Sequence, residues 1–337
     1  MQTQALPAAA PAARTLRLRG IAILLAAAVL IGLVPYLGSY AIRVVDSVLI
    51  YTLLGIGLNL VVGYAGLLDL GFVAFYAVGA YSYALLASPQ FGIHLPFLLV
   101  LPIGAGLGAC FGILLGIPVL RLRGDYLAVV TLGFGEIIRV LLNNADALTN
   151  GPQGVIGIDR ARVFGIALSR PVDFFWVLLV ACLVCGTLVY RLERSLLGQA
   201  WAAIREDQDA ARGVGINTTR AKLAAFAISA AIGGLAGVIF AAFQRYVSPD
   251  SFSLNESILI VLIIVIGGVG NIFGVLLGAV VLVLLPELLR EFAAYRMLVL
   301  GLVMATLIVL RPQGLLPRNL GPGELLSLLR GRRRGSR

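Results

Sequence analysis

The sequence predicts an all-α polytopic membrane protein, and three observations lead to this prediction. The chain is 60% hydrophobic with a mean hydropathy of +1.00. Only 12% of its residues are charged, whereas soluble domains average about 25%. Apolar runs of membrane-spanning length follow one another through most of the chain, and the charges gather between them and at the ends. A soluble fold is therefore excluded.

About ten transmembrane helices are expected, since roughly twenty apolar residues cross a bilayer as a helix. The first run is long for a signal peptide and no A-x-A site follows it, so we expect it to remain as a helix. The domain organisation is then a tail of residues 1–20, a transmembrane domain of residues 21–310 and a basic tail of residues 311–337. The predicted spans lie near residues 21–38, 43–62, 67–87, 96–118, 125–143, 172–190, 221–243, 257–273, 274–290 and 293–310.

The distribution of basic residues predicts the orientation. If the N-terminus is inside, residues 1–20, 119–124, 191–222 and 311–337 face the cytoplasm and together hold eighteen Arg and Lys. The outer segments and their margins hold seven. Loops on the cytoplasmic side carry an excess of basic residues, so both termini are expected in the cytoplasm. This pattern also argues against nucleic acid as the reason for the positive charge.

Residues 191–222 form a charged segment between two apolar runs, with six basic and four acidic residues. Such a segment belongs in water. Residues 198–209 are predicted to form a short helix with one apolar face, and Asn217 offers a side-chain oxygen to start the next helix. The helix is suited to docking a partner outside the membrane, and a solvated connecting loop is the alternative. The residues expected to take part are Trp201, Ile204, Glu206, Asp207, Ala210, Ala211, Gly213 and Gly215.

Two glycine-interrupted segments, one in each half, break the apolar pattern. Gly63 and Gly66 separate the second and third runs, and Gly267 and Gly270 interrupt the eighth just before the ninth. Neither break leaves room for an aqueous loop. Paired interruptions of this kind indicate a substrate pathway in transporters. Tight turns or close helix packing are the alternative. The shared G-x-x-G spacing suggests a weak internal repeat.

A few charged residues lie inside the apolar runs. A charge in the bilayer is energetically costly, so each of these residues is expected to have a structural or functional role. Asp69 follows the first glycine break, and either caps the third helix or faces the pathway. Glu136 and Arg139 stand three residues apart on one helix, so they either neutralise each other or bind a zwitterionic solute. Arg43 and Asp46 have the same spacing and are expected to form a structural pair.

The sequence offers no catalytic or nucleotide-binding motif. It has no G-x-x-x-x-G-K-[ST], no H-E-x-x-H and no G-x-S-x-G, so we expect neither an enzyme nor a cofactor in this chain. Cys182 and Cys185 lie inside an apolar run without other ligands, which favours packing over a metal site. The outer loop of residues 144–170 either receives a soluble delivery protein or is a plain connector. Three classes remain: a permease subunit driven by a separate ATPase, an ion-driven secondary transporter and, with least support, an intramembrane enzyme.

Four long stretches then point to one family. They are GIGLNLVVGYAGLLDLGFVAFYAVGAYSYALL at 55–86, DYLAVVTLGFGEIIRVLLNNADALTNGPQGVIGI at 125–158, GINTTRAKLAAFAISAAIGGLAG at 215–237 and RPQGLLP at 311–317. In this order they resemble the M-type permease subunit of branched-chain amino acid ABC importers. The likeness runs from about residue 40 to 317. Urea and short-chain amide permeases share some of these blocks and are the alternative within the group.

The resemblance implies a bacterial inner-membrane permease that moves branched-chain amino acids inward by alternating access. It implies as partners a second permease, two cytoplasmic ATPases that bind the ATP, and a periplasmic substrate-binding protein. Residues 206–215 then take the place of the ATPase-coupling loop. Asp207 and Gln208 after Glu206 depart from the E-A-A pattern of other ABC importers.

Overall fold

Apolar helices dominate the computed structural model. It describes residues 38–311 except 90, 120, 121, 123, 164 and 291–295, together with 32, 34–36 and 314–316. Within these residues, six helical segments are long and apolar enough to cross a membrane, which confirms an all-α polytopic membrane protein. The longer helices are α2 (Ser39–Asn59, continued by the π-helical turn Leu60–Tyr64), α3 (Val73–Leu86), α4 (Phe97–Val119), α5 (Asp125–Asn144), α7 (Pro171–Glu193), α8 (Leu196–Glu206), α10 (Thr218–Gln244), α11 (Leu254–Gly267), α12 (Ile272–Leu288) and α13 (Arg296–Leu310).

Short elements complete the chain between these helices. They are the 3-10 turns Val34–Tyr36, Gly151–Gln153 and Pro249–Phe252, the short helices α6 (Asp146–Thr149) and α9 (Gln208–Gly213), and the two-residue strands β1 (Ala87–Ser88), β2 (Ile93–His94), β3 (Val155–Ile156), β4 (Arg162–Val163), β5 (Ile166–Ala167) and β6 (Tyr246–Val247).

The predicted spans from residue 43 onward each coincide with a helix, although the third and the eighth have other bounds and one predicted short helix is divided. The eighth span, predicted at 257–273, is α11 at Leu254–Gly267, because the second glycine break ends it. Apart from 32, 34–36 and 38, the predicted first span lies outside the described residues, as do residues 1–20 and most of 311–337, so the count of ten stays a prediction. The third span begins at Val73 instead of residue 67, because Gly66 turns the chain with φ +69° and an extended segment follows. The predicted helix of residues 198–209 is two helices. Asp207 ends α8 and starts α9, where its Oδ1 accepts from the N–H groups of Asp209 and Ala210 at 2.8 and 3.0 Å.

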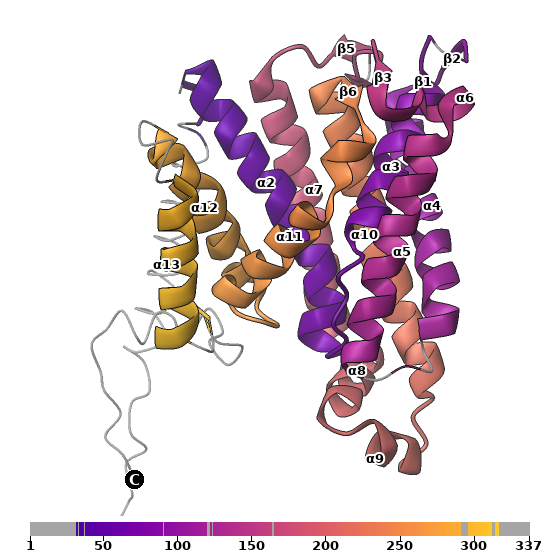
Figure 1. Cartoon of the computed structure of the whole chain (residues 1–337), viewed down its shortest axis with the longest axis vertical. Helices are drawn as coiled ribbons and strands as arrows, with labels where there is room; N and C mark the ends of the chain where they lie inside the picture. The colour runs from indigo at the N-terminus through magenta and orange to yellow at the C-terminus, as the bar shows by residue number, and fades with distance from the viewer. Residues whose placement is uncertain are drawn as a thin grey trace, which may run out of the picture.

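The loops gather at two opposite ends of the helices (Figure 1). At one end β3 pairs with β6, with Val155 opposite Val247, and the N–H of Asp159 donates to the carbonyl of Ala87 at 2.8 Å. The other end holds α8 and α9. These are the two groups of loops that the charge pattern assigned to opposite faces.

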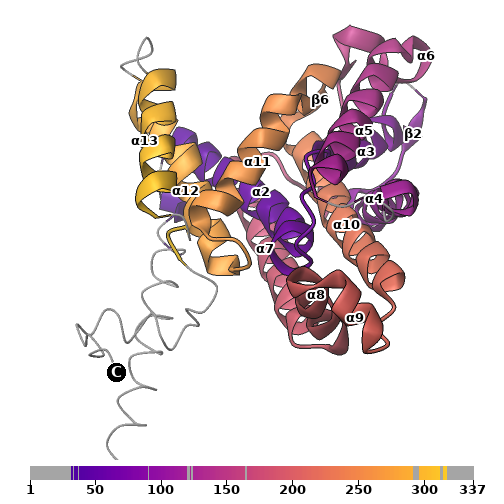
Figure 2. The same ribbon diagram turned by 60° about the horizontal axis from the view of Figure 1, so that its bottom comes forward.

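α10 is the central helix of the larger part of the molecule, with α2 on one side and α3 and α4 on the other (Figure 2). Small residues allow the backbones to meet. A Cβ on Gly79 of α3 or on Gly104 of α4 would press into α10, at the Gly234 backbone and the Val238 side chain respectively. In a bilayer the hydrophobic effect does not drive helices together, so their association depends on close van der Waals packing of this kind.

Candidate functional site

The two glycine breaks meet at one point in the structure. The N–H of Gly270 donates to Oδ1 of the fully buried Asn59 at 2.8 Å. Gly63 is buried beside this bond, and a Cβ there would collide with both Asn59 Oδ1 and the Gly270 nitrogen. The breaks are thus packed against each other, 211 residues apart in sequence.

The second break is also covered by the segment that follows α13. The N–H groups of Leu315 and Leu316 donate to the carbonyls of Ile266 and Gly267 at 2.7 and 2.9 Å. Gly268 and Gly270 adopt φ of +125° and +86°, which favour glycine. Irregular backbone at membrane depth is tolerated where it is buried in protein, and that condition holds here. Gly63, Gly267 and Gly270 are packed as tight turns would be, whereas Gly66 lines a cavity described below. A role of these glycines in transport stays a prediction.

The apolar face of α8, which the sequence offered as a docking face for a partner, is turned toward the chain's own helices. Trp201 and Ile204 are only 1% and 5% exposed, and Nε1 of Trp201 donates to the carbonyl of Ala221 on α10 at 2.7 Å. In this chain alone they therefore expose little surface, and their contact with a partner stays a prediction. They are buried because a helix with a single apolar face gains most by burying it against the adjacent membrane domain.

The surface that α8 and α9 leave free is made by other residues. Leu196 and Val214 are 84% and 78% exposed. Ala211 is buried, whereas the other coupling-loop candidates are exposed: Glu206, Asp207, Ala210, Gly213 and Gly215. The guanidinium of Arg205 donates to the carbonyl of Gly63, and a Cβ on Gly66 would also meet Arg205. α8 is therefore linked directly to the first glycine break.

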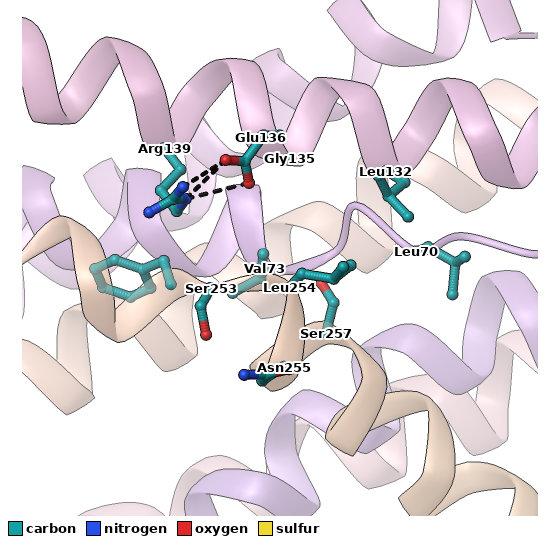
Figure 3. Close-up of a pocket in the computed structure, with 11 residues that line it drawn as sticks. Leu70, Val73, Leu132, Gly135, Glu136, Arg139, Ser253, Leu254, Asn255 and Ser257 are labelled. Atoms are coloured by element: carbon teal, nitrogen blue, oxygen red, sulfur yellow. Dashed lines mark hydrogen bonds and ion pairs between the residues drawn. The ribbon is translucent and has the colours of Figure 1, made fainter.

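A cavity of about 420 Å³, called here the outer cavity, lies between α5 and the start of α11 (Figure 3). Glu136 and Arg139 line it and form an ion pair, with Nη2 of Arg139 2.5 Å from Oε1 of Glu136 and Nε 3.1 Å from both carboxylate oxygens. Asp250 lies 3.6 Å from the same guanidinium. The other residues that line the outer cavity are Leu70, Val73, Leu132, Gly135, Phe252, Ser253, Leu254, Asn255 and Ser257.

Sequence reasoning missed the contribution of α11. Its first residues look like the beginning of one more apolar run, although the stretch SFSLNES at 251–257 carries five polar residues. Ser253 stands at the N-cap of α11, and Glu256 in the first turn accepts a hydrogen bond from the hydroxyl of Tyr51 at 2.8 Å. This polar stretch just before an apolar run was the signal available in the sequence.

A second cavity, of about 250 Å³, lies toward the end of the molecule that holds α8. This inner cavity is lined by Gly66 and Leu68 from the extended segment, Leu127 from α5 and Arg205 from α8. α5 therefore lines both cavities. Between them the N–H of Leu70 donates to Oγ1 of Thr131 on α5 at 3.0 Å.

Asp69 belongs to neither cavity lining. It is fully buried, and its Oδ1 accepts from the N–H of Gly71 at 2.9 Å, so it shapes the turn before α3. Phe72 occupies the N-cap of α3, so Asp69 is not that cap.

Asp46 and Arg43 do not form the hydrogen-bonded pair that the sequence predicts. Asp46 is fully buried, and neither carboxylate oxygen has a hydrogen-bond partner among the described residues. The guanidinium of Arg43 lies over the ring of Phe243 at 5.9 Å.

The thiol of Cys182 donates to the carbonyl of Leu49 at 3.3 Å, as a packed cysteine does.

Comparisons with known proteins agree on one family. Residues 40–309 match the family described as the permease component of the branched-chain amino acid transport system. The chain is 46% identical over 300 residues to the high-affinity branched-chain amino acid transport system permease protein LivM of Salmonella typhimurium, covering 82% of this chain and 70% of that protein. It is 47% identical over 292 residues to LivM of Escherichia coli, covering 80% and 68%.

A more distant relative is the permease protein LivH of the same kind of system in Escherichia coli, 24% identical over 284 residues that cover 80% of this chain and 91% of that protein. No solved structure matches the chain. The family match spans α2 to α13, and thereby both cavities and both glycine breaks. The chain therefore belongs to the family of permease components of branched-chain amino acid transport systems.

Proposed function

We propose that this protein is the membrane-spanning subunit of an ATP-driven importer that carries leucine, isoleucine and valine into the cell. The family match and the two LivM relatives support the substrate class. The observation that supports the ATP-driven mechanism is the attachment of α8 to the membrane helices. Its apolar face is fixed to α10 and its Arg205 to Gly63, so a force applied at its outer surface acts on the membrane helices.

The expected partners of this chain are inferred from its relatives and from its two exposed ends. A second permease of the LivH kind is expected beside this chain, because LivM and LivH of Escherichia coli are both named as permease proteins of a high-affinity branched-chain amino acid transport system. Two ATPase subunits, which bind the ATP, are expected on the exposed side of α8 and α9. A periplasmic binding protein is expected at the opposite end, where β3 and β6 pair.

The two cavities suggest how a solute passes. Both lie along α5, and the contact of Leu70 with Thr131 separates them. In alternating access the outer cavity is open first, and the extended segment 65–72 then moves so that the inner cavity receives the solute. ATP binding and release in the partners would favour the two states in turn, since a ligand shifts a conformational equilibrium through its different affinity for the two states.

The proposed location is the bacterial inner membrane, with both termini in the cytoplasm. A reporter fused after Gln208, at α9, should be active on the cytoplasmic side, and one fused after Gly154 should be active on the periplasmic side. The excess of basic residues in 191–222 is the physical reason. Activity of both reporters on one side contradicts this orientation.

Uptake by the assembled complex tests the function directly. Proteoliposomes with ATP inside and the binding protein outside should accumulate leucine, and ionophores that dissipate ion gradients should leave uptake unchanged. Urea and short-chain amides should neither accumulate nor compete. Uptake that stops with the ionophore and ignores ATP would indicate a secondary transporter.

A further inference from the structure

The outer cavity has the size and the wall chemistry of a site for a small polar solute. Its volume of about 420 Å³ lies within the usual range of small-molecule sites, roughly 300–1,000 Å³. Its wall combines an ion pair from α5, the start of α11 and several apolar side chains (Figure 3). Charged side chains inside a membrane domain are costly, and they normally mark a pathway or a binding site.

The ion pair matches the charges of a free amino acid. Glu136 and Arg139 neutralise each other, yet their side chains remain 44% and 32% exposed. An amino acid carries one ammonium and one carboxylate a short distance apart. Its carboxylate can replace Glu136 beside Arg139, and its ammonium can replace Arg139 beside Glu136. This exchange leaves the net charge of the cavity unchanged. A neutral amide or urea offers no such exchange.

The start of α11 adds a second group of donors. The first N–H groups of a helix have no partner within it, and the helix dipole favours an anion there. Ser253 makes no side-chain capping bond. Glu256, in the same turn, is held by Tyr51 and does not line the cavity.

Ser257 gives independent evidence for a ligand. It is 1% exposed, it lines the outer cavity, and its hydroxyl has no hydrogen-bond partner among the residues that the structure describes. Figure 3 shows its side chain directed from α11 toward the side where α5 lies. A buried hydroxyl without a partner is destabilising, so a state in which it donates to a ligand is favoured.

We propose that the outer cavity is the resting site of the amino acid within this permease. The α-carboxylate binds to Arg139, the first turn of α11 and the Ser257 hydroxyl, and the α-ammonium binds to Glu136. The aliphatic side chain contacts the apolar wall, made by Leu70, Val73, Leu132 and Leu254. This inference rests on the proposed function and adds the residues that recognise the solute.

Protection of an introduced thiol tests the site in the assembled importer. Leu254 is 40% exposed and lines the cavity, so Leu254→Cys is made with Cys110, Cys182 and Cys185 replaced by Ala. Leucine should slow its modification by a water-soluble thiol reagent several-fold. Leucinamide, which lacks the carboxylate, and 4-methylpentanoate, which lacks the ammonium, should protect little.

A second variant assigns the contact. Adding Ser257→Ala should raise the leucine concentration needed for half-protection about two- to tenfold, as expected for one lost hydrogen bond. The matched control is Ser82→Ala, a buried serine of α3 whose hydroxyl donates to the carbonyl of Gly79 at 2.6 Å, outside the cavity lining. It should leave protection unchanged.

Equal modification rates with and without leucine, in an importer that takes up leucine, overturn the site and leave the proposed function standing. This measurement holds even if Ser257→Ala does not assemble. Equal protection by leucine and leucinamide also overturns the assignment of the carboxylate contacts. Failure of the wild-type importer to take up leucine overturns both proposals.

Discussion

The N–H of Gly270, between α11 and α12, donates a 2.8 Å hydrogen bond to Oδ1 of Asn59 on α2. It joins the two glycine breaks of the chain, one from each half. Since Arg205 of α8 contacts the carbonyl of Gly63 one turn further on, α8 and both breaks form one connected structure.

Asn59→Leu removes the acceptor and leaves the buried N–H of Gly270 without a partner, which costs about 1–3 kcal/mol. The variant should unfold at a lower temperature in detergent and transport leucine more slowly per molecule. Thr52→Val is the control, because Thr52 is a buried residue of α2 whose hydroxyl bonds only its own helix, at the carbonyl of Val48. A variant as stable and active as Thr52→Val would show that the bond joining the breaks is dispensable.

Arg205→Ala breaks the contact between α8 and the first glycine break while leaving Trp201 anchored. We expect the ATPase to co-purify normally and leucine uptake to fall about tenfold or more, since charged hydrogen bonds typically contribute about 1.5–3 kcal/mol. The control is Arg194→Ala, whose guanidinium stacks over Tyr190 at 4.3 Å beside α8. Uptake at the control level, measured with the ATPase bound, argues against transmission through Arg205.

Trp201→Ala should destabilise the permease itself, because it empties a buried site and removes the bond to Ala221. Large-to-small changes of this kind cost about 3–5 kcal/mol. The amount of protein in the membrane and its unfolding temperature should both fall. Normal stability combined with loss of the ATPase would instead restore Trp201 as a partner contact.

Leu196→Asp is the complementary change, on the exposed side of α8. A charge at an 84% exposed position leaves the core intact, so the protein level should stay normal. If this surface receives the ATPase, the charge should release it on purification and abolish uptake. A bound ATPase with normal uptake would place the docking surface elsewhere.

Gly66→Leu should reduce transport per molecule well below the wild-type rate. Gly66 has φ +69° and a Cβ there would meet Arg205, so a larger side chain both strains the backbone and displaces α8. Gly106→Leu on α4 is the control, because nothing lies within 4 Å of a Cβ at that position. Equal transport by the two variants would show that the first break tolerates bulk.

Local chemistry accounts for what the sequence predicted well. Apolar runs located the helices from α2 onward, and Asn217 caps α10 as expected, with its Oδ1 accepting from the N–H of Arg220 at 3.0 Å. Periodicity could also show that Trp201 and Ile204 share a face. It could not show which neighbour that face contacts, because a partner and the chain's own helices present similar apolar surfaces.

The candidate site depended on contacts between distant segments. Glu136 and Arg139 stood out as charges inside an apolar run, and the structure places both in the outer cavity. Ser257 gave no signal of its own, since a serine in a membrane helix usually bonds its own backbone. The contact of Asn59 with Gly270 joins residues 211 apart, and no local pattern encodes it.

The glycine-packed contacts of α3, α4 and α10 have a mechanical consequence. Gly79 and Gly104 lie against α10 so closely that the three helices cannot slide past one another without collisions. α10 has 27 residues and is thus about 40 Å long, from the α9 end to β6. It acts as a stiff lever. If its α9 end lies in the cytoplasm as proposed, a displacement imposed there would be transmitted along the helix to the β3–β6 pair. The nucleotide state of the proposed ATPase partners would then alter how firmly the opposite end holds the proposed delivery protein.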